Sequence, residues 1–160
     1  MADIEIGIGE IAVAKDTENL TASGVGSCLV ITFYESRLKI GAMAHAMLPS
    51  PVIRGHSSVV RKKVQCQQQD AKYIDIAIDQ MLNKLEAGGA KRGNLEAKIV
   101  GGANMFSAFK SDISKQNVLT AKEKLKEEGI RLVGECVGGS IGRSVEFSTT
   151  TGVVTVKVKF

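Results

Sequence analysis

The sequence has no tryptophan, and its aromatic content is only 4%. Proteins that bind single-stranded nucleic acid stack bases on aromatic side chains, and this chain has few to offer. The net charge of +4 is modest, and the basic residues are scattered apart from the run Arg61-Lys62-Lys63. We therefore expect no nucleic-acid binding.

Long hydrophobic runs are also missing. No stretch approaches the 18 or so consecutive apolar residues that a membrane-spanning helix needs. The first residues, Met-Ala-Asp-Ile-Glu-Ile, are acidic where a secretory signal would carry basic residues before an apolar run. The sequence thus predicts a cytoplasmic protein that does not insert into a membrane.

Cysteine and histidine are few. The three cysteines, at 28, 66 and 136, are odd in number and widely spaced, which argues against a disulfide framework. No Cys-x-x-Cys or His-x-x-x-His pair is present, and the histidines are only His45 and His56. We therefore expect no metal site and no cofactor. Cys66 and Cys136 are interpreted as non-catalytic and His56 as solvated.

The composition is that of a soluble globular protein, with 44% hydrophobic and 24% charged residues. A chain of 160 residues suits one domain, which we assign to residues 1–160. Apolar alternation and β-branched residues predict one or two strands in 4–14 and further strands at 29–35, 38–47, 95–100, 131–137, 143–148 and 153–159.

Two segments have helical periodicity. Residues 72–87 place apolar side chains on one face and are followed by Gly88-Gly89, a common helix end. Residues 114–128 form the second, with Ser114 as the predicted N-cap and Gly129 beyond the end. Many strands with two helices predict an α+β fold. Residues 49–70 hold both prolines and predict a long surface loop, a candidate lid.

Cys28 and His45 fall on one face of a predicted hairpin. If the turn is centred between Ser36 and Arg37, Cys28 pairs directly with His45. Directly opposite residues have Cβ atoms about 4.5–5.5 Å apart. The other face then carries an apolar set that suits a core, consisting of Leu29, Ile31, Phe33, Ile40, Ala42 and Ala44. A one-residue slip would break this match, so the apolar pattern favours the register.

A thiol beside an imidazole can lose its proton and become a thiolate nucleophile. Gly26 and Ser27 precede Cys28 and permit a tight turn, in which backbone N–H groups could stabilise an oxyanion. The residues alone leave a second interpretation open. In it, Cys28 is a small buried residue and His45 is a hydrogen-bonded core histidine.

Three ordered motifs resemble the CheD family: Gly-Val-Gly-Ser-Cys at 24–28, Gly-Ala-Met-Ala-His-Ala-Met-Leu-Pro at 41–49, and Gly-Gly-Ala-Asn-Met-Phe at 101–106. Supporting matches are Lys-Tyr-Ile-Asp at 72–75, Gln-Asn-Val at 116–118, Gly138-Gly139 and the run from Gly142 to Phe147. The resemblance covers about residues 4–150. Motifs in this order are far more specific than any one of them.

CheD proteins are chemoreceptor glutamine deamidases of bacterial and archaeal chemotaxis. The resemblance implies a protein-glutamine glutaminase that acts on methyl-accepting chemotaxis receptors, converts Gln side chains to Glu and releases ammonia. Cys28 matches the family nucleophile and His45 its general base, with a thioester intermediate. The same acyl-enzyme would permit hydrolysis of receptor methyl esters. The implied fold resembles that of the cytotoxic necrotizing factors, with packed mixed β-sheets flanked by helices.

The sequence departs from the family pattern at the third catalytic residue, a threonine six positions before the cysteine. That position is Ala22 here, while Thr21 and Ser23 flank it on the opposite strand face. A bulge or slipped register would restore Thr21, which we prefer, or Ser23 would orient His45 instead.

The resemblance also suggests a surface near the active site that meets the receptor or the phosphatase CheC. Its residues are Gly101, Gly102, Ala103, Met105 and Phe106. The alternative is a glycine turn that tucks Met105 and Phe106 into the core. Two other functions stay open: a weakly catalytic or non-catalytic regulator that binds a CheC-type phosphatase, and an unrelated thiol hydrolase.

Overall fold

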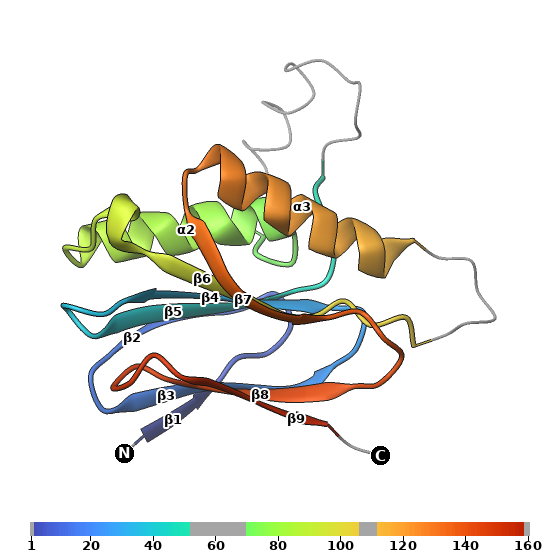
Figure 1. The fold of residues 1–160 in the computed structure, drawn as a ribbon, viewed down its shortest axis with the longest axis horizontal. Helices are drawn as coiled ribbons and strands as arrows, with labels where there is room; N and C mark the ends of the chain where they lie inside the picture. Colours follow the sequence, from blue (N-terminus) through green and yellow to red (C-terminus); the bar gives the residue numbers. More distant parts are fainter. Residues whose placement is uncertain (1, 52–69, 106–111, 159–160) are drawn as a thin grey trace.

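A computed structural model describes residues 2–51, 70–105 and 112–158. These residues form two mixed β-sheets and two long helices (Figure 1), which confirms the predicted α+β class. The likeness to cytotoxic necrotizing factors stays a prediction. Most of the predicted loop at 49–70, including His56 and Cys66, lies outside the described residues.

The smaller sheet has four strands, and its first pair is parallel while the others are antiparallel. Across the sheet, the order is β1 (Ala2–Glu5), β3 (Glu18–Val25), β8 (Arg143–Ser148) and β9 (Val154–Val158). The bounds of β8 match the prediction. Strand β3, which the sequence analysis had not delimited, carries the segment that leads into Cys28.

The larger sheet has five strands, all antiparallel to their neighbours except the parallel pair β6 and β7. Their order is β2 (Ile11–Lys15), β5 (Ile40–Ala46), β4 (Leu29–Glu35), β6 (Glu96–Gly101) and β7 (Arg131–Val137). The central strand, β4, is buried along nearly its whole length, as expected from its run of β-branched and aromatic residues.

Two helices, α2 (Ile74–Ala87) and α3 (Ile113–Glu127), lie close to their predicted ranges, and a short 3₁₀ turn, η1 (Arg92–Asn94), follows α2. The predicted N-cap of the second helix was wrong. Asp112 occupies that position, and Ser114 lies inside the helix, where it is buried. The helix begins earlier than predicted because Ser114 belongs to its buried face.

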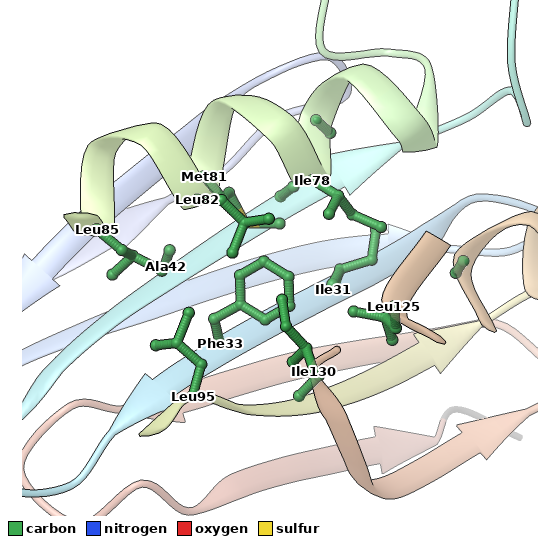
Figure 2. Packing of buried hydrophobic residues seen from close by; sticks show 14 of the residues in the cluster. Ile31, Phe33, Ala42, Ile78, Met81, Leu82, Leu85, Leu95, Leu125 and Ile130 are labelled. Atoms are coloured by element: carbon green, nitrogen blue, oxygen red, sulfur yellow. The ribbon is translucent and has the colours of Figure 1, made fainter. Parts of the chain in front are cut away.

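The elements stack in three layers, with both helices on one face of the five-stranded sheet and the four-stranded sheet on the other (Figure 1). The layer between helices and sheet is packed with aliphatic side chains around Phe33 (Figure 2). The layer between the sheets includes Leu20, Ala22, Val30, Met43 and Phe147. Each large apolar side chain that is fully buried contributes about 1.5–3 kcal/mol to folding.

The hairpin of β4 and β5 forms, but its predicted register was wrong by two positions. Leu29 pairs with Ala46 and Val30 pairs with His45, so Cys28 is not directly opposite His45. The turn spans residues 36–39 and ends on Lys39 in the left-handed region, with φ of 50°. Because the shift is even, every side chain keeps its predicted face. The predicted core face of this hairpin is confirmed in the layer beneath the helices.

Candidate active site

Cys28 and His45 lie at the same end of the five-stranded sheet. Cys28 directly precedes β4, and His45 is the last residue but one of β5. His45 shares a strand face with Met43, which is buried between the two sheets. Cys28 lies two residues before Val30, another residue of this layer, so the alternation of β4 places it on the same face. Both side chains therefore belong to the inter-sheet layer.

The observed register makes Cys28 and His45 diagonal neighbours, since Val30 takes the place directly opposite His45. Diagonal positions in a regular antiparallel pair are about 7–8 Å apart, with side chains still in reach of each other. The Nε2 atom of His45 has no hydrogen-bond partner among the described residues. The thiol and the imidazole are therefore close in register but not hydrogen-bonded to each other in this structure.

The segment between β1 and β2 holds His45 in place. The Nδ1 atom of the ring lies 3.2 Å from the carbonyl oxygen of Ile6. The peptide N–H of Gly9 donates to the His45 carbonyl at 2.8 Å, and the N–H of His45 donates to the Glu10 carbonyl at 3.2 Å. A carbonyl oxygen only accepts, so Nδ1 carries the proton and Nε2 is left with its lone pair. This is the tautomer that a general base needs.

Burial controls the charge of both groups. Burial raises the pKa of the Cys28 thiol above its ordinary value of 9.0, while the peptide N–H of Cys28 itself acts in the opposite direction. Burial also lowers the pKa of His45 below its ordinary value of 6.5, opposed by the hydrogen bond to the Ile6 carbonyl. Both shifts favour the uncharged forms, so the resting pair is a thiol and a neutral imidazole.

The glycine-rich segment that follows β6 lies against the Cys28 loop, as the sequence resemblance suggested. Gly102 donates its N–H to the Cys28 carbonyl at 2.8 Å, and Ala103 donates to the Gly26 carbonyl at 2.9 Å. A Cβ atom at Gly101, where φ is +120°, would lie 2.3 Å from the Cys28 carbonyl oxygen. This position therefore requires glycine.

Met105 packs over the same loop, because a Cβ atom at Gly26 would lie 2.9 Å from its Cγ. Met105 is nevertheless partly exposed, so it is not tucked into the core. Phe106 lies outside the described residues. Of the predicted surface, Gly101, Gly102, Ala103 and Met105 are thus brought together with the Cys28 loop.

The structure brings neither Thr21 nor Ser23 to the imidazole. The Thr21 hydroxyl lies 3.5 Å from the Ile4 carbonyl, and the Ser23 hydroxyl donates to the Glu5 carboxylate at 3.0 Å. Ala22, between them on the strand, points into the inter-sheet layer, so Thr21 and Ser23 point to the opposite face of the sheet. The expected bulge is present, since the pairing of β3 with β8 shifts between Ala22 and Val25. It leaves the Thr21 hydroxyl on the outer face.

Among the residues that the structure describes, Thr21 is connected to His45 through the main chain of Ile6. Ile6 donates its N–H to the Thr21 carbonyl at 2.7 Å, and the carbonyl of the same Ile6 faces Nδ1 of His45. In this structure the His45 ring is thus bonded to a backbone carbonyl and not to a threonine hydroxyl. Sequence reasoning missed Ile6, and no side-chain pattern could have revealed it, because any residue type supplies the same carbonyl.

Asn117 of α3 is a second residue that the sequence analysis had assigned no role. Its Nδ2 donates to the Ser27 carbonyl at 2.9 Å and to the Met47 carbonyl at 3.1 Å. In the sequence, this role could have been suspected from a polar residue on the buried face of α3, beside Ala121 and Leu125. Asn117 places a helix of the outer layer in direct contact with both segments of the site.

Within residues 2–51, 70–105 and 112–158, no group of His, Cys, Asp and Glu side chains is arranged to hold a metal ion. In the same ranges, no helix is both long and apolar enough to cross a bilayer.

The fold and the site define an α+β protein with a Cys–His pair between two mixed sheets. Residues 47–158 match the family described as CheD chemotactic sensory transduction, a range that begins after His45. The chain belongs to the CheD family.

Curated relatives are similar over nearly the whole chain. The "Probable chemoreceptor glutamine deamidase CheD" of Pyrococcus abyssi is 39% identical over 158 residues, covering 97% of this chain and 91% of the relative. The "Chemoreceptor glutamine deamidase CheD" of Halalkalibacterium halodurans is 39% identical, covering 96% and 92%. That of Thermotoga maritima is 39% identical over 152 residues, covering 95% and 89%. These alignments extend beyond residues 47–158 and so include the segment of the Cys–His pair.

Proposed function

We propose that this protein is a protein-glutamine deamidase of chemoreceptors, with Cys28 as nucleophile and His45 as general base. The observation that carries the proposal is the hydrogen bonding of the His45 ring. Its Nδ1 is engaged by the Ile6 carbonyl, and its buried Nε2 has no partner in the described part of the chain. A thiol and a base of this kind carry out nucleophilic catalysis when they come within hydrogen-bond reach, a contact that is often longer before substrate binds. The names of the relatives supply the substrate class.

The reaction proceeds through an acyl-enzyme. Nε2 of His45 takes the proton of the Cys28 thiol as the sulfur attacks the carboxamide carbon of a glutamine side chain. The imidazolium then returns that proton to the leaving nitrogen, and ammonia departs as the C–N bond breaks, leaving a thioester. Water, deprotonated by the same Nε2, attacks the thioester and releases glutamate and free thiol.

The peptide N–H of Cys28 is the first candidate for the oxyanion site, because it belongs to the same residue as the attacking sulfur. Gly26 and Ser27 shape the turn that presents it. In measured cases, removal of one oxyanion donor costs about 2.7–4 kcal/mol of transition-state stabilisation. The same acyl-enzyme would form from a glutamate methyl ester, so receptor methylesterase activity is part of the proposal.

Exposed apolar side chains around the site fit a protein substrate. Ile8 belongs to the segment that braces His45, Met47 follows β5, Met105 covers Gly26, and Ile141 adjoins Gly142, whose Cβ would lie 3.7 Å from Met105. Exposed apolar groups that gather at one place favour contact with another macromolecule. Cytoplasmic receptor helices would dock here, and a CheC-type phosphatase is the second proposed partner of this face.

The test is deamidation of a receptor fragment, followed by mass spectrometry for the increase of about 1 Da that accompanies each Gln-to-Glu conversion. Wild type is expected to convert specific glutamines, while Cys28→Ala converts none and still binds the fragment. A Cys28→Ala variant that deamidates as fast as wild type would remove the assignment of the nucleophile. Binding of a CheC-type phosphatase without any deamidation by wild type would favour the purely regulatory function.

A further inference from the structure

The pairing of β4 with β5 ends just where the candidate site begins. Leu29 and Ala46 form the last pair of the ladder, so Cys28 and Met47 extend beyond it. The carbonyl groups of Ser27 and Met47 at this end are bound by the side-chain amide of Asn117. One amide group of α3 thus bridges the two strand ends where the ladder stops.

The orientation of this amide is unambiguous. Both Nδ2 hydrogens point to carbonyl oxygens, at 2.9 and 3.1 Å, and a flipped amide would face two acceptors with its own oxygen. Asn117 is completely buried, and its Oδ1 has no hydrogen-bond partner among the described residues. A buried acceptor without a partner is costly and rare in folded proteins. An apolar residue here would avoid that cost but would leave the Ser27 and Met47 carbonyls without this donor, so the two bonds account for the asparagine.

The Ser27 carbonyl and the Cys28 N–H belong to one rigid peptide plane, and they point in opposite directions because the peptide is trans. The bond from Asn117 to the Ser27 carbonyl therefore also fixes the direction of the Cys28 N–H. In the proposed reaction, that N–H is the candidate oxyanion donor beside the Cys28 sulfur. The second bond, to Met47, fixes the chain two residues beyond His45.

We propose that Asn117 is a positioning residue that holds the Cys28 peptide and the end of the His45 strand in one geometry. The proposal rests on the proposed function, in which these two residues carry out the reaction. Asn117 itself does not touch the substrate. It acts on the rate through the direction of the Cys28 N–H and through the separation of the thiol and the imidazole.

The test uses Asn117→Asp, which keeps the shape but cannot donate to both carbonyls, and Asn117→Leu, which fills the space with an apolar side chain. We expect kcat to fall at least about tenfold in both variants, with KM within about twofold of wild type. Alkylation of Cys28 by iodoacetamide at pH 8, followed by mass spectrometry of the Cys28 peptide, should slow at least about threefold. The full-length protein is used throughout.

Thr149→Val is the matched control, since it also removes a buried hydrogen bond, from Thr149 Oγ1 to the Glu18 carbonyl at 2.7 Å, at the opposite end of β3. This variant should keep both rates within about twofold of wild type. Asn117 variants with wild-type kcat and alkylation rate, and only a lower melting temperature, would overturn the positioning role.

A measurement on wild type covers the case in which the Asn117 variants do not fold. Carbamidomethylation of Cys28 should shift the NMR resonances of the Asn117 side-chain amide, and unchanged resonances would overturn the proposal. Alkylation and NMR do not require deamidase activity. If wild type does not deamidate receptor fragments, the proposed function is wrong. The alkylation and NMR measurements still test whether Asn117 positions the Cys28 segment.

Discussion

His45 points its Nδ1 at the carbonyl of Ile6, 3.2 Å away, and this contact connects the N-terminal segment to the candidate site. The ring cannot rotate to offer Nδ1 to the thiol without losing that bond. Only Nε2 is available for proton transfer. In the proposed reaction, the two ring nitrogens therefore have separate roles, Nδ1 in orientation and Nε2 in proton transfer.

The pH dependence of deamidation follows from the neutral resting pair. Because burial lowers the pKa of His45, the acidic limb of kcat/KM should have its midpoint below 6.5. Because burial raises the pKa of the Cys28 thiol, the rate should stay high up to at least pH 9.0. Initial rates of ammonia release between pH 5 and 10 check both limbs. Rapid alkylation of Cys28 at pH 5 would instead indicate a preformed thiolate–imidazolium pair.

The stability of the fold should fall in mild acid for the same reason. The unfolded chain protonates His45 near pH 6.5, whereas the folded protein resists protonation until lower pH, so the unfolded state binds more protons. The free energy of unfolding should thus fall as the pH drops below 6.5 toward the lowered pKa of folded His45. Urea unfolding at pH 7 and pH 5 measures this loss. His45→Gln should lose less over the same interval, and an equal loss would contradict the assignment.

Gly101→Ala should destabilise the protein by at least about 3 kcal/mol, since it combines left-handed strain with a direct clash. Its Cβ would lie 2.3 Å from the Cys28 carbonyl oxygen. Gly129→Ala, with φ of +71° and no atom within 4 Å, should show the strain alone, about 1–2 kcal/mol. Gly93→Ala, in open space without positive φ, should be nearly neutral. Similar losses of unfolding free energy in Gly101→Ala and Gly129→Ala would mean that the Cys28 loop moves to avoid the clash.

Thr21→Val and Ser23→Ala should each leave kcat/KM within about twofold of wild type, because neither hydroxyl is directed at the imidazole. The same assay applied to His45→Gln provides the contrast, with a loss of at least about 100-fold expected from removal of a general base. A drop of tenfold or more in Thr21→Val would restore the threonine to the reaction. In that case, the β1–β3 edge must rearrange when substrate binds.

Local patterns in the sequence predicted the strands well. The bounds of β4, β7 and β8 agree with the prediction, because β4 is a run of β-branched and aromatic residues and β7 and β8 carry apolar residues among polar ones, each bounded by polar or glycine-containing segments. The side-chain faces of β4 and β5 were also correct. Side chains alternate between the two faces of a strand with a period of two residues. An error of two residues in the register therefore leaves every side chain on its predicted face.

The register itself could not be predicted, because the turn carries no glycine or asparagine to mark its left-handed residue. Lys39 adopts φ of 50° there, and the Glu35 carboxylate accepts the N–H of Leu38 at 2.8 Å. The orientation of His45 was equally hidden, since it depends on a main-chain carbonyl. Asn117 was visible as a polar residue on an apolar stripe, but its two partners are backbone atoms that only the folded structure brings together.

The strand that leads into the Ile6 contact has four residues and forms the edge of the smaller sheet, where β3 is its one neighbour among the described strands. Edge segments open locally at a lower free-energy cost than the whole domain. Fraying of β1 would release the imidazole while the packed layer beneath the helices stays intact. Catalysis would thus be lost on warming before the protein melts, and the thermal limit of the enzyme would be set by its first strand rather than by its core.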